Sequence, residues 1–588
     1  MQFLGHMSRR HGGGVVALSA IVVVVLASGN SVSAADRPTA LAGELPIGQP
    51  LKPARVVPVP LAATRIPWWT NVLEPSGAAP RGRLLTMDPA AYARSKALAA
   101  ASVRPRTFQP GTQGRASSGS TFRVLSRAAR GRITKKPRGG RNAKLRFLGS
   151  AALQKSFDGT NRTVAGAFPP DPHGAVGTDY YTEVTNRRIE VYDKETNALL
   201  VSQSLAGFFN YTNELIFDPR VIRDNANNRW IVVAIAFHEG PGPGPQPGEP
   251  QRLFIAVSQT QDVLGSFYFY QMNVNFSGVD DFDFPQLGHG SGAILVTGNV
   301  ATMNGSFAYN ELLAFPKGNL YAGQFVNSLV WTGLGPSTAP PLVLDGNPNS
   351  YLISAKTEEF GTQTSSELFF YRGENLSTSG LARVTRLPDI FVGEYSIPAD
   401  VPACAAGETY ESSDGRFVNA STQYGGSLWN THTSGIWPSN GIPTPRFYEI
   451  NVSTGISDQE GWYYASATSN DWNASIAANT DGDAYVTWNS LDSPPCFEPQ
   501  IRFSSREGSD PLHVMNDQGV LASSGARYNP TTDENEVWGD YSAVSLDPSN
   551  YPGCPPGRRA WIVNQYTPGP VGGTTTNWAT RIGRLGFC

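Results

Sequence analysis

The sequence has few charges, few cysteines and no long apolar run. Charged residues make up only 16% of the 588 residues, which argues against helical bundles and coiled coils. The four cysteines include no C-x-x-C pair, and their spacings match no zinc-binding pattern. No stretch reaches the ~20 apolar residues that a membrane-spanning helix needs. We therefore expect neither a membrane span nor a structural zinc site.

Glycine, proline and aromatic residues are abundant instead. The chain has 61 Gly, 45 Pro and 11% aromatic residues, a composition typical of many short strands joined by turns. The length allows several average domains, but large all-β folds often run as one. The composition therefore indicates an all-β protein.

The first residues have the pattern of a secretory signal. Arg9 and Arg10 make the N-terminal region positively charged, and Val15–Ala27 is apolar. Val32-Ser33-Ala34 then has the small residues of a cleavage site. We predict residues 1–34 as a signal peptide, and therefore a secreted protein, extracellular or periplasmic. A retained signal anchor is the alternative.

Residues 35–150 are predicted to be a low-order pro-segment or linker, because they show no sustained period of 2 or 3.6. Ten Lys or Arg and no acid lie between Arg123 and Arg146. Such a run contacts nucleic acid, acidic polysaccharide or a membrane surface in some proteins, and in others it is a solvated, protease-sensitive linker. Because the remainder of the chain is acidic, we expect no nucleic-acid partner. The sequence leaves open whether the segment is removed on maturation.

From Phe157 onward one pattern recurs seven times: a Gly or Asp turn, an apolar strand, a second strand, and a closing strand with aromatics. The seven units lie within 174–194, 218–257, 283–317, 342–371, 415–450, 474–503 and 539–584. Repeats of this size are typical of β-propellers, in which each blade covers a face of the next. We therefore predict a seven-bladed β-propeller over residues 151–588. A pair of β-sandwiches is the structural alternative.

In a propeller, the region around Phe157 is placed to supply the last strand of the seventh blade and so close the ring. Cys554 and Cys588 both fall in that blade, and we predict a disulfide between them that holds the closure. Cys404 and Cys496 are then predicted to join loops of blades five and six.

Several motifs resemble those of exported bacterial proteins with sialidase-like β-propellers, most of which have no assigned activity. Two of them are Asp-Pro-Arg-Val at 218–221 and Trp-Gly-Asp-Tyr-Ser at 538–542. The other matching stretches are 169–171, 174–177, 229–230, 283–285, 296–299, 315–317 and 578–582. The resemblance implies a propeller fold and an exported location, without implying a reaction. Sialidases themselves carry a repeated motif called the Asp-box. Residues 480–488 match this motif only loosely.

Polar residues stand at the starts of the units, where inner strands would face a central channel. They are Asp171, Asp218, Arg220, Asp283, Arg416, Asp540 and Tyr541. Converging at one channel mouth, they would bind Ca²⁺, a sugar or an acidic polymer end. Paired carboxylates would also serve as general acid and base on a glycosidic bond, with Tyr541 as proton donor or nucleophile. The competing interpretation is structural, because Asp beside Pro or Gly commonly makes turns and caps backbone N–H groups.

The sequence carries no HExxH or G-x-S-x-G motif, and its histidines, among them His173, His238, His289 and His432, are dispersed. We therefore predict a monomeric exported propeller that binds a carbohydrate or another extracellular polymer without cleaving it. The first alternative is a glycan-cleaving enzyme, a glycoside hydrolase or polysaccharide lyase that uses the channel-mouth carboxylates. The second is a surface or matrix scaffold for protein partners.

Overall fold

The computed structural model describes residues 45–65, 150–237, 248–278, 280–302, 307–356, 364–403, 407–435, 441–492, 498–531, 535–570 and 572–588. Over these residues the fold is nearly all-β, as expected, and the helices are the short α2 (Arg162–Ala165), α3 (Leu205–Phe209) and α4 (Lys317–Tyr321). No helix in this part of the chain is long and apolar enough to cross a bilayer. The predicted signal peptide, the basic run, His238, Cys404 and Cys496 lie outside the described residues.

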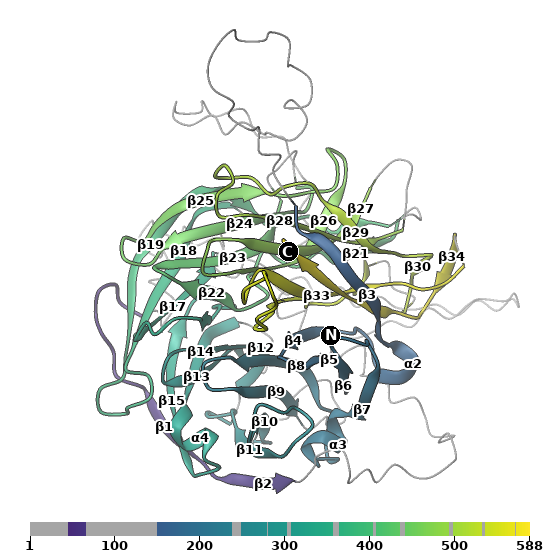
Figure 1. The fold of residues 1–588 in the computed structure, drawn as a ribbon. Helices are drawn as coiled ribbons and strands as arrows, with labels where there is room; N and C mark the ends of the chain where they lie inside the picture. Colours follow the sequence, from purple (N-terminus) through teal and green to yellow (C-terminus); the bar gives the residue numbers. More distant parts are fainter. Residues whose placement is uncertain are drawn as a thin grey trace, which may run out of the picture. The chain divides into compact units, whose positions relative to one another are not determined.

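Most strands belong to seven consecutive antiparallel repeats, which we number 1 to 7 (Figure 1). Repeat 1 is β4 (His173–Val176), β5 (Tyr180–Thr185), β6 (Arg188–Asp193) and β7 (Leu199–Ser204). Repeat 2 is β8 (Phe217–Asp224), β9 (Arg229–Phe237), β10 (Gln251–Ser258) and β11 (Phe267–Asn273). Repeat 3 is β12 (Asp280–His289), β13 (Ala293–Thr302), β14 (Phe307–Pro316) and β15 (Val326–Leu334), and repeat 4 is β17 (Asn349–Ala355), β18 (Thr364–Glu374) and β19 (Arg383–Ser396).

The last three repeats follow the same antiparallel order. Repeat 5 is β22 (Ser421–Tyr424), β23 (Ser427–Ser434), β24 (Thr444–Asn451) and β25 (Ile456–Trp462). Repeat 6 is β26 (Asn470–Ala478), β27 (Ala484–Leu491), β28 (Gln500–Arg506) and β29 (Gly519–Ser523). Repeat 7 is β32 (Ala543–Leu546), β33 (Arg559–Tyr566), β35 (Ala579–Gly586) and β3 (Ala152–Asn161). Two small sheets join β20 (Val401–Pro402), β21 (Thr409–Tyr410) and β31 (Asn535–Glu536), and β30 (Ala526–Tyr528) with β34 (Gly573–Thr575).

Strands near the inner ends of the repeats are buried on both faces because a neighbouring repeat covers each face. All residues of β8, β26 and β27 are buried. Successive side chains of a strand point to opposite faces, and in β9 Val232 accordingly packs toward repeat 1 and Val233 toward repeat 3. Continuous runs such as Ile231-Val232-Val233 therefore replace the alternating pattern of a sheet with one wet face.

Each repeat packs against the next through an apolar cluster of its own. Each cluster takes members from both repeats: in order, Val191 and Val232, Ile255 and Val296, Leu295 and Phe369, Phe370 and Tyr448, Trp429 and Trp488, and Tyr485 and Ile562. A further cluster joins repeat 7 to repeat 1, where the rings of Tyr181 and Trp561 stack with centroids 5.3 Å apart. The seventh repeat thus lies against the first.

Strand β3 comes from the N-terminal side of repeat 1 but completes repeat 7. It pairs antiparallel with β35, with Phe157 opposite Ile582. Arg581 adds an ion pair with Asp158 at 2.6 Å. The expectation that the region around Phe157 supplies the last strand of the seventh unit is confirmed.

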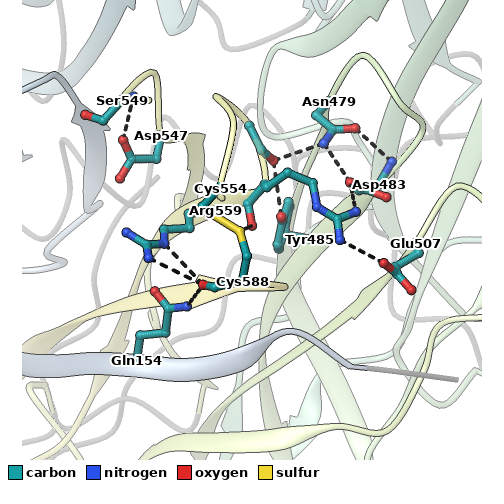
Figure 2. Close-up of a disulfide and its surroundings, with 12 residues drawn as sticks. Gln154, Asn479, Asp483, Tyr485, Glu507, Asp547, Ser549, Cys554, Arg559 and Cys588 are labelled. Atoms are coloured by element: carbon teal, nitrogen blue, oxygen red, sulfur yellow. Dashed lines mark hydrogen bonds and ion pairs between the residues drawn. A yellow bond between two sulfur atoms is a disulfide. The ribbon is translucent and has the colours of Figure 1, made fainter. Parts of the chain in front are cut away.

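A disulfide joins Cys554 and Cys588 in repeat 7, as predicted (Figure 2). Cys554 lies in the turn between β32 and β33, and Cys588 follows β35. Gln154 of β3 donates to the carbonyl oxygen of Cys588 at 2.5 Å. The disulfide therefore fastens the segment after β35 close to the strand that closes the repeat.

The start of the fourth unit differs from the prediction. Leu342 was expected to begin it, but β16 (Pro341–Val343) instead lies between β12 and β22 and pairs parallel with both. Ala339 takes the inner position beside β17, opposite Ile353. At the crossing point a Cβ on Gly288 would lie 2.4 Å from the carbonyl oxygen of Pro341, so a glycine is required there.

Part of the predicted low-order segment forms strands. Within residues 35–150 the structure describes residue 150 and residues 45–65, and the latter contain β1 (Arg55–Val59) and β2 (Leu61–Arg65). β1 pairs antiparallel with β15 and β2 with β11, at the outer edges of repeats 3 and 2 (purple in Figure 1). We call residues 45–65 the strap.

Candidate functional site

Several inner strands contain, or directly follow, a residue in the left-handed conformation. Asp171, Asp218, Phe284 and Asn473 have φ angles of 45°, 50°, 55° and 52°. In β8, β12 and β26 the pairing register shifts at this point, and such a bulge re-aims the side chains that follow. Asp and Asn adopt this conformation readily, whereas a Phe does so only when its surroundings hold it there.

Arg220 follows this bulge in repeat 2 and is almost completely buried, with 1% of its surface exposed. Its Nε donates to the carbonyl oxygen of Pro285, its Nη1 to Asn419 Oδ1, and its Nη2 to the carbonyl oxygen of Val418, each at 2.9 Å. Pro285 belongs to repeat 3, and the other two acceptors precede β22 of repeat 5. One guanidinium thus ties three repeats together.

Tyr541 of repeat 7 lies against the same guanidinium. The Arg220 Cζ atom is 3.4 Å from the centroid of the Tyr541 ring. The Tyr541 hydroxyl donates to Asp218 Oδ2 at 2.7 Å, and the ring packs edge-to-face on Phe284, with centroids 5.2 Å apart. The aromatic ring and the cation attract each other because the ring face is electronegative.

Asp171 and Asp540 join the first and last repeats. Asp171 Oδ1 accepts a hydrogen bond from the backbone N–H of Asp540 at 2.7 Å, and Asp171 Oδ2 accepts one from Asn186 Nδ2 at 2.6 Å. Asp171 is fully buried, whereas Asp540 is partly exposed. Asp171 thus makes the structural contacts expected of a turn-forming aspartate.

Asp283 and Arg416 are the remaining two of the seven polar residues predicted from the sequence. The Arg416 guanidinium lies 4.6 Å from the centroid of the Phe284 ring, and its Nε donates to Asp414 Oδ1 at 2.6 Å. The charges of Arg416 and Asp540 both act on the carboxyl of Asp283. The structure therefore brings all seven predicted residues together around Phe284 and Tyr541, and we call them the central cluster. Their role in ligand binding stays a prediction.

Burial controls the protonation of the central cluster. It raises the pKa of Asp218 well above its ordinary value, and the charges of Asp283 and Asp171 raise it further. Burial, followed by the charge of Asp281, raises the pKa of Asp283 to about 7. Burial also raises the pKa of Tyr541. The raised pKa favours the protonated form of Asp218, a carboxylic acid that both donates and accepts hydrogen bonds.

A set of buried asparagines, in or directly after the second strands of five repeats, was not predicted from the sequence. They are Asn186, Asn299, Asn430, Asn489 and Asn564. Asn186 Oδ1 accepts from the backbone N–H of Asp218 at 2.8 Å, and Asn299 Oδ1 from that of Ser337 at 2.7 Å, so each holds the start of the next repeat. Three of the five have a signal in the printed sequence, because Asn430, Asn489 and Asn564 directly follow apolar residues, whereas Asn186 follows Thr185 and Asn299 follows Gly298.

The described histidines have structural contacts. His432 is buried between the carbonyl oxygen of Gly415 and the Tyr448 hydroxyl, and burial lowers its pKa to about 4. Burial likewise lowers the pKa of His289 to about 4, beside the ammonium of Lys317. Within the described part of the chain, no three His, Cys, Asp or Glu side chains are grouped as metal ligands.

A second buried acidic group lies between repeats 1 and 7. Glu183 and Glu190 face each other across β5 and β6, and the Tyr192 hydroxyl donates to both. Glu183 Oε2 also accepts from the backbone N–H of Thr160 in β3 at 2.9 Å. Burial, and then the charge of Glu190, raises the pKa of Glu183 to about 8.

No protein-family model matches the chain, and no curated protein sequence matches it. Among solved structures it is similar to a mutant sialidase of Trypanosoma rangeli with trans-sialidase activity, at 8% identity and a TM-score of 0.33, over 57% of this chain and 54% of that one. It is similar to the hemagglutinin-neuraminidase ectodomain of parainfluenza virus 5, at 10% identity and a TM-score of 0.34, over 61% and 82%. It is also similar to an exo-β-1,3-galactanase of Phanerochaete chrysosporium, at 10% identity and a TM-score of 0.28, over 74% and 99%. Because these TM-scores lie below 0.5, we draw nothing from them about activity.

Proposed function

We propose that the seven repeats form one seven-bladed β-propeller that is exported and binds a carbohydrate or another extracellular polymer at its central cluster without cleaving it. The propeller is supported by the order of packing, in which each repeat contacts the next and repeat 7 contacts repeat 1. Completion of repeat 7 by β3 supports it further, since propellers hide their sheet edges by radial repetition.

Export is supported by two independent features. The Cys554–Cys588 disulfide is a bond that persists mainly in oxidising compartments. The sequence around Arg9, Val15–Ala27 and Ala34 has the order of charges, apolar residues and small residues found in secretory signals.

Binding is supported by the chemistry of the central cluster. The carboxyl groups of Asp283 and Asp540 and the guanidinium of Arg416 act on one another within the central cluster. Sugar hydroxyls pair with such acceptors and donors, so the combination suits a hydroxyl-rich ligand. Asp540 is the member that is partly exposed, and we assign it the first contact with ligand.

The environment of Tyr541 carries the proposal that no cleavage occurs. Its side chain is fully buried, its ring face is covered by Arg220, and its hydroxyl donates to Asp218. A nucleophile or proton donor must come within hydrogen-bond reach of the reacting atom. Because Arg220 covers the ring of Tyr541 and Asp218 accepts from its hydroxyl, the phenol has no access to a glycosidic bond.

The test is a glycan array with acidic and neutral polysaccharides, followed by reducing-sugar and unsaturated-product assays on every glycan that binds. We expect binding without product. Asp540→Asn should weaken the affinity by at least about tenfold, as the loss of one charged hydrogen bond does. Asp458→Asn, an exposed carboxylate on β25, is the matched control and should leave the affinity unchanged.

Each other outcome contradicts the proposal. Formation of product would establish a glycan-cleaving enzyme, and Tyr541→Phe would then show whether the phenol takes part. Failure to bind any glycan would favour a scaffold for protein partners. Equal effects of the two Asp→Asn substitutions would place the binding surface away from the central cluster.

A further inference from the structure

The strap follows the outer edges of three repeats in succession. Gly48 donates to the carbonyl oxygen of Arg386 at 2.7 Å, and Leu51 exchanges two backbone hydrogen bonds with Val384, at 2.9 and 3.1 Å, all on β19 of repeat 4. β1 then runs along β15 of repeat 3, from Arg55 opposite Val330 to Val59 opposite Val326. β2 continues along β11 of repeat 2. The strap therefore occupies backbone groups that an open sheet edge would present to another strand.

Side chains of the strap alternate between the protein and solvent. Val59 is fully buried in the apolar cluster between repeats 2 and 3, and Val57 and Leu61 pack against the same cluster. Val56, on the other face of the strand, is 49% exposed. This period of two is the pattern of a half-buried strand, and it gives the edge a preference for aliphatic residues at every second position.

The other end of the strap is anchored in the same way. Leu45 is buried in the apolar cluster between repeats 3 and 4, and its backbone N–H donates to the carbonyl oxygen of Gly333 at 3.2 Å. Trp331 Nε1 donates to the carbonyl oxygen of Leu51 at 3.1 Å. Both apolar side chains and main-chain groups thus hold the strap along its length.

Backbone pairing and apolar burial thus act along the described length of the strap, from Leu45 to Leu61. Residues 66–149 separate the strap from β3 in the sequence. We attribute the attachment of the strap to these non-covalent contacts.

We propose that the outer edges of β11, β15 and β19 form a binding site for an extended peptide with alternating aliphatic residues, and that residues 45–65 occupy it as a separable ligand. Main-chain pairing gives such a site its affinity, and the pockets for alternate side chains give it specificity. The strap then stays bound after the connection is cut, and a free peptide of the same sequence replaces it.

The experiment uses the full chain with a specific protease site introduced between residues 66 and 149. After cleavage, native gel filtration and mass spectrometry should find the fragment that contains residues 45–65 co-eluting with the remainder. A labelled synthetic peptide of residues 45–65 should replace the fragment in the cut protein, and its binding should reach saturation as the peptide concentration rises. Release of the fragment during native gel filtration, or failure of the peptide to exchange after the fragment is displaced by mild denaturant, would overturn the proposal.

Peptide variants provide a matched control that does not depend on folding of a mutant protein. A Val59→Asp peptide should compete at least about tenfold more weakly than the unaltered peptide, because its carboxylate would enter an apolar cluster. A Val56→Asp peptide carries the same charge on the exposed face and should compete as well as the unaltered peptide. Equal competition by the two variants would contradict the proposed register.

Discussion

The Tyr541 hydroxyl of repeat 7 donates a hydrogen bond to the side chain of Asp218 in repeat 2, at 2.7 Å. Arg220, two residues after Asp218, covers the ring of the same tyrosine. These contacts join repeats that are not neighbours in sequence, and so the central cluster adds cross-links to those made by adjacent sheets. The cluster should consequently matter for stability as well as for binding.

Arg220→Met should destabilise the protein by about 3–5 kcal/mol, because it leaves the carbonyl oxygens of Pro285 and Val418 without their buried donor. Thermal or urea unfolding measures the change. Arg229→Met in the same repeat is the control, since its guanidinium is partly exposed and donates to local turn carbonyls. Similar losses for the two variants would contradict a special role for Arg220.

Stability should fall as the pH rises because of Glu183. In the unfolded chain its carboxyl has a pKa of 4.5, and in the folded protein burial and Glu190 raise this pKa to about 8. Between these values the folded protein keeps a proton that the unfolded chain has released, so this contribution is complete below pH 4.5 and lost by about pH 8. Glu183→Gln keeps the hydrogen-bond acceptor for Thr160 without the charge, and its melting temperature should exceed the wild-type value by a margin that grows over this range. A margin independent of pH would show that Glu183 does not hold its proton.

Reduction of the Cys554–Cys588 disulfide should lower the melting temperature. The two cysteines are 34 residues apart, and a loop of this length corresponds to about 3–4 kcal/mol in the chain-entropy account of cross-links. Melting curves with and without reductant give the effect. In the double variant Cys554→Ser/Cys588→Ser, any remaining sensitivity to reductant reports on Cys404 and Cys496.

Lys194→Met should lower the free energy of unfolding by about 3–5 kcal/mol. The substitution leaves the buried carboxylate of Asp547, which lies 2.6 Å from the ammonium, without a counter-charge. This pair joins repeat 1 to repeat 7, and Lys317 with Asp224 joins repeats 3 and 2 at the same distance. Arg372→Met, which breaks a pair that is about one-third exposed, should cost less than about 1 kcal/mol. If Lys194→Met/Asp547→Leu fails to recover stability relative to Lys194→Met, the loss lies in packing and not in the unpaired charge.

Much of the strand order was predictable from the sequence because the second strands, such as β9 and β13, lie between two neighbouring repeats and carry apolar residues on both faces. Runs such as Ile231-Val232-Val233 and Ile294-Leu295-Val296 therefore stand out without any structural information. The pairing of β3 with β35 was predictable for a different reason, namely that a seventh unit short of a strand needs one from elsewhere in the chain.

The features that sequence reasoning missed depend on contacts between distant segments. The alternation of Val57, Val59 and Leu61 is brief and lies beside prolines, so only pairing with β15 and β11 defines these strands. Leu342 has the apolar character of an inner strand, but its neighbours are β12 and β22 rather than β17. The central residues were found from their turn motifs, while Phe284 was overlooked because a left-handed Phe has no signature in the sequence.

The pairing of β3 with β35 also has a consequence for how fast the protein reaches its native state. Asp158 and Arg581, which form an ion pair across these strands, are 423 residues apart in the chain. Contacts of such long range raise the contact order, and folding slows because loop entropy is lost before the contact forms. As the chain is synthesised, the strands of repeats 1 to 6 emerge one repeat after another. β3 emerges before them, but its partner β35 is the last strand to be made. Until then the edges of β3 and β33 stay open, and this interval is when the folding chain is most exposed to pairing with another copy.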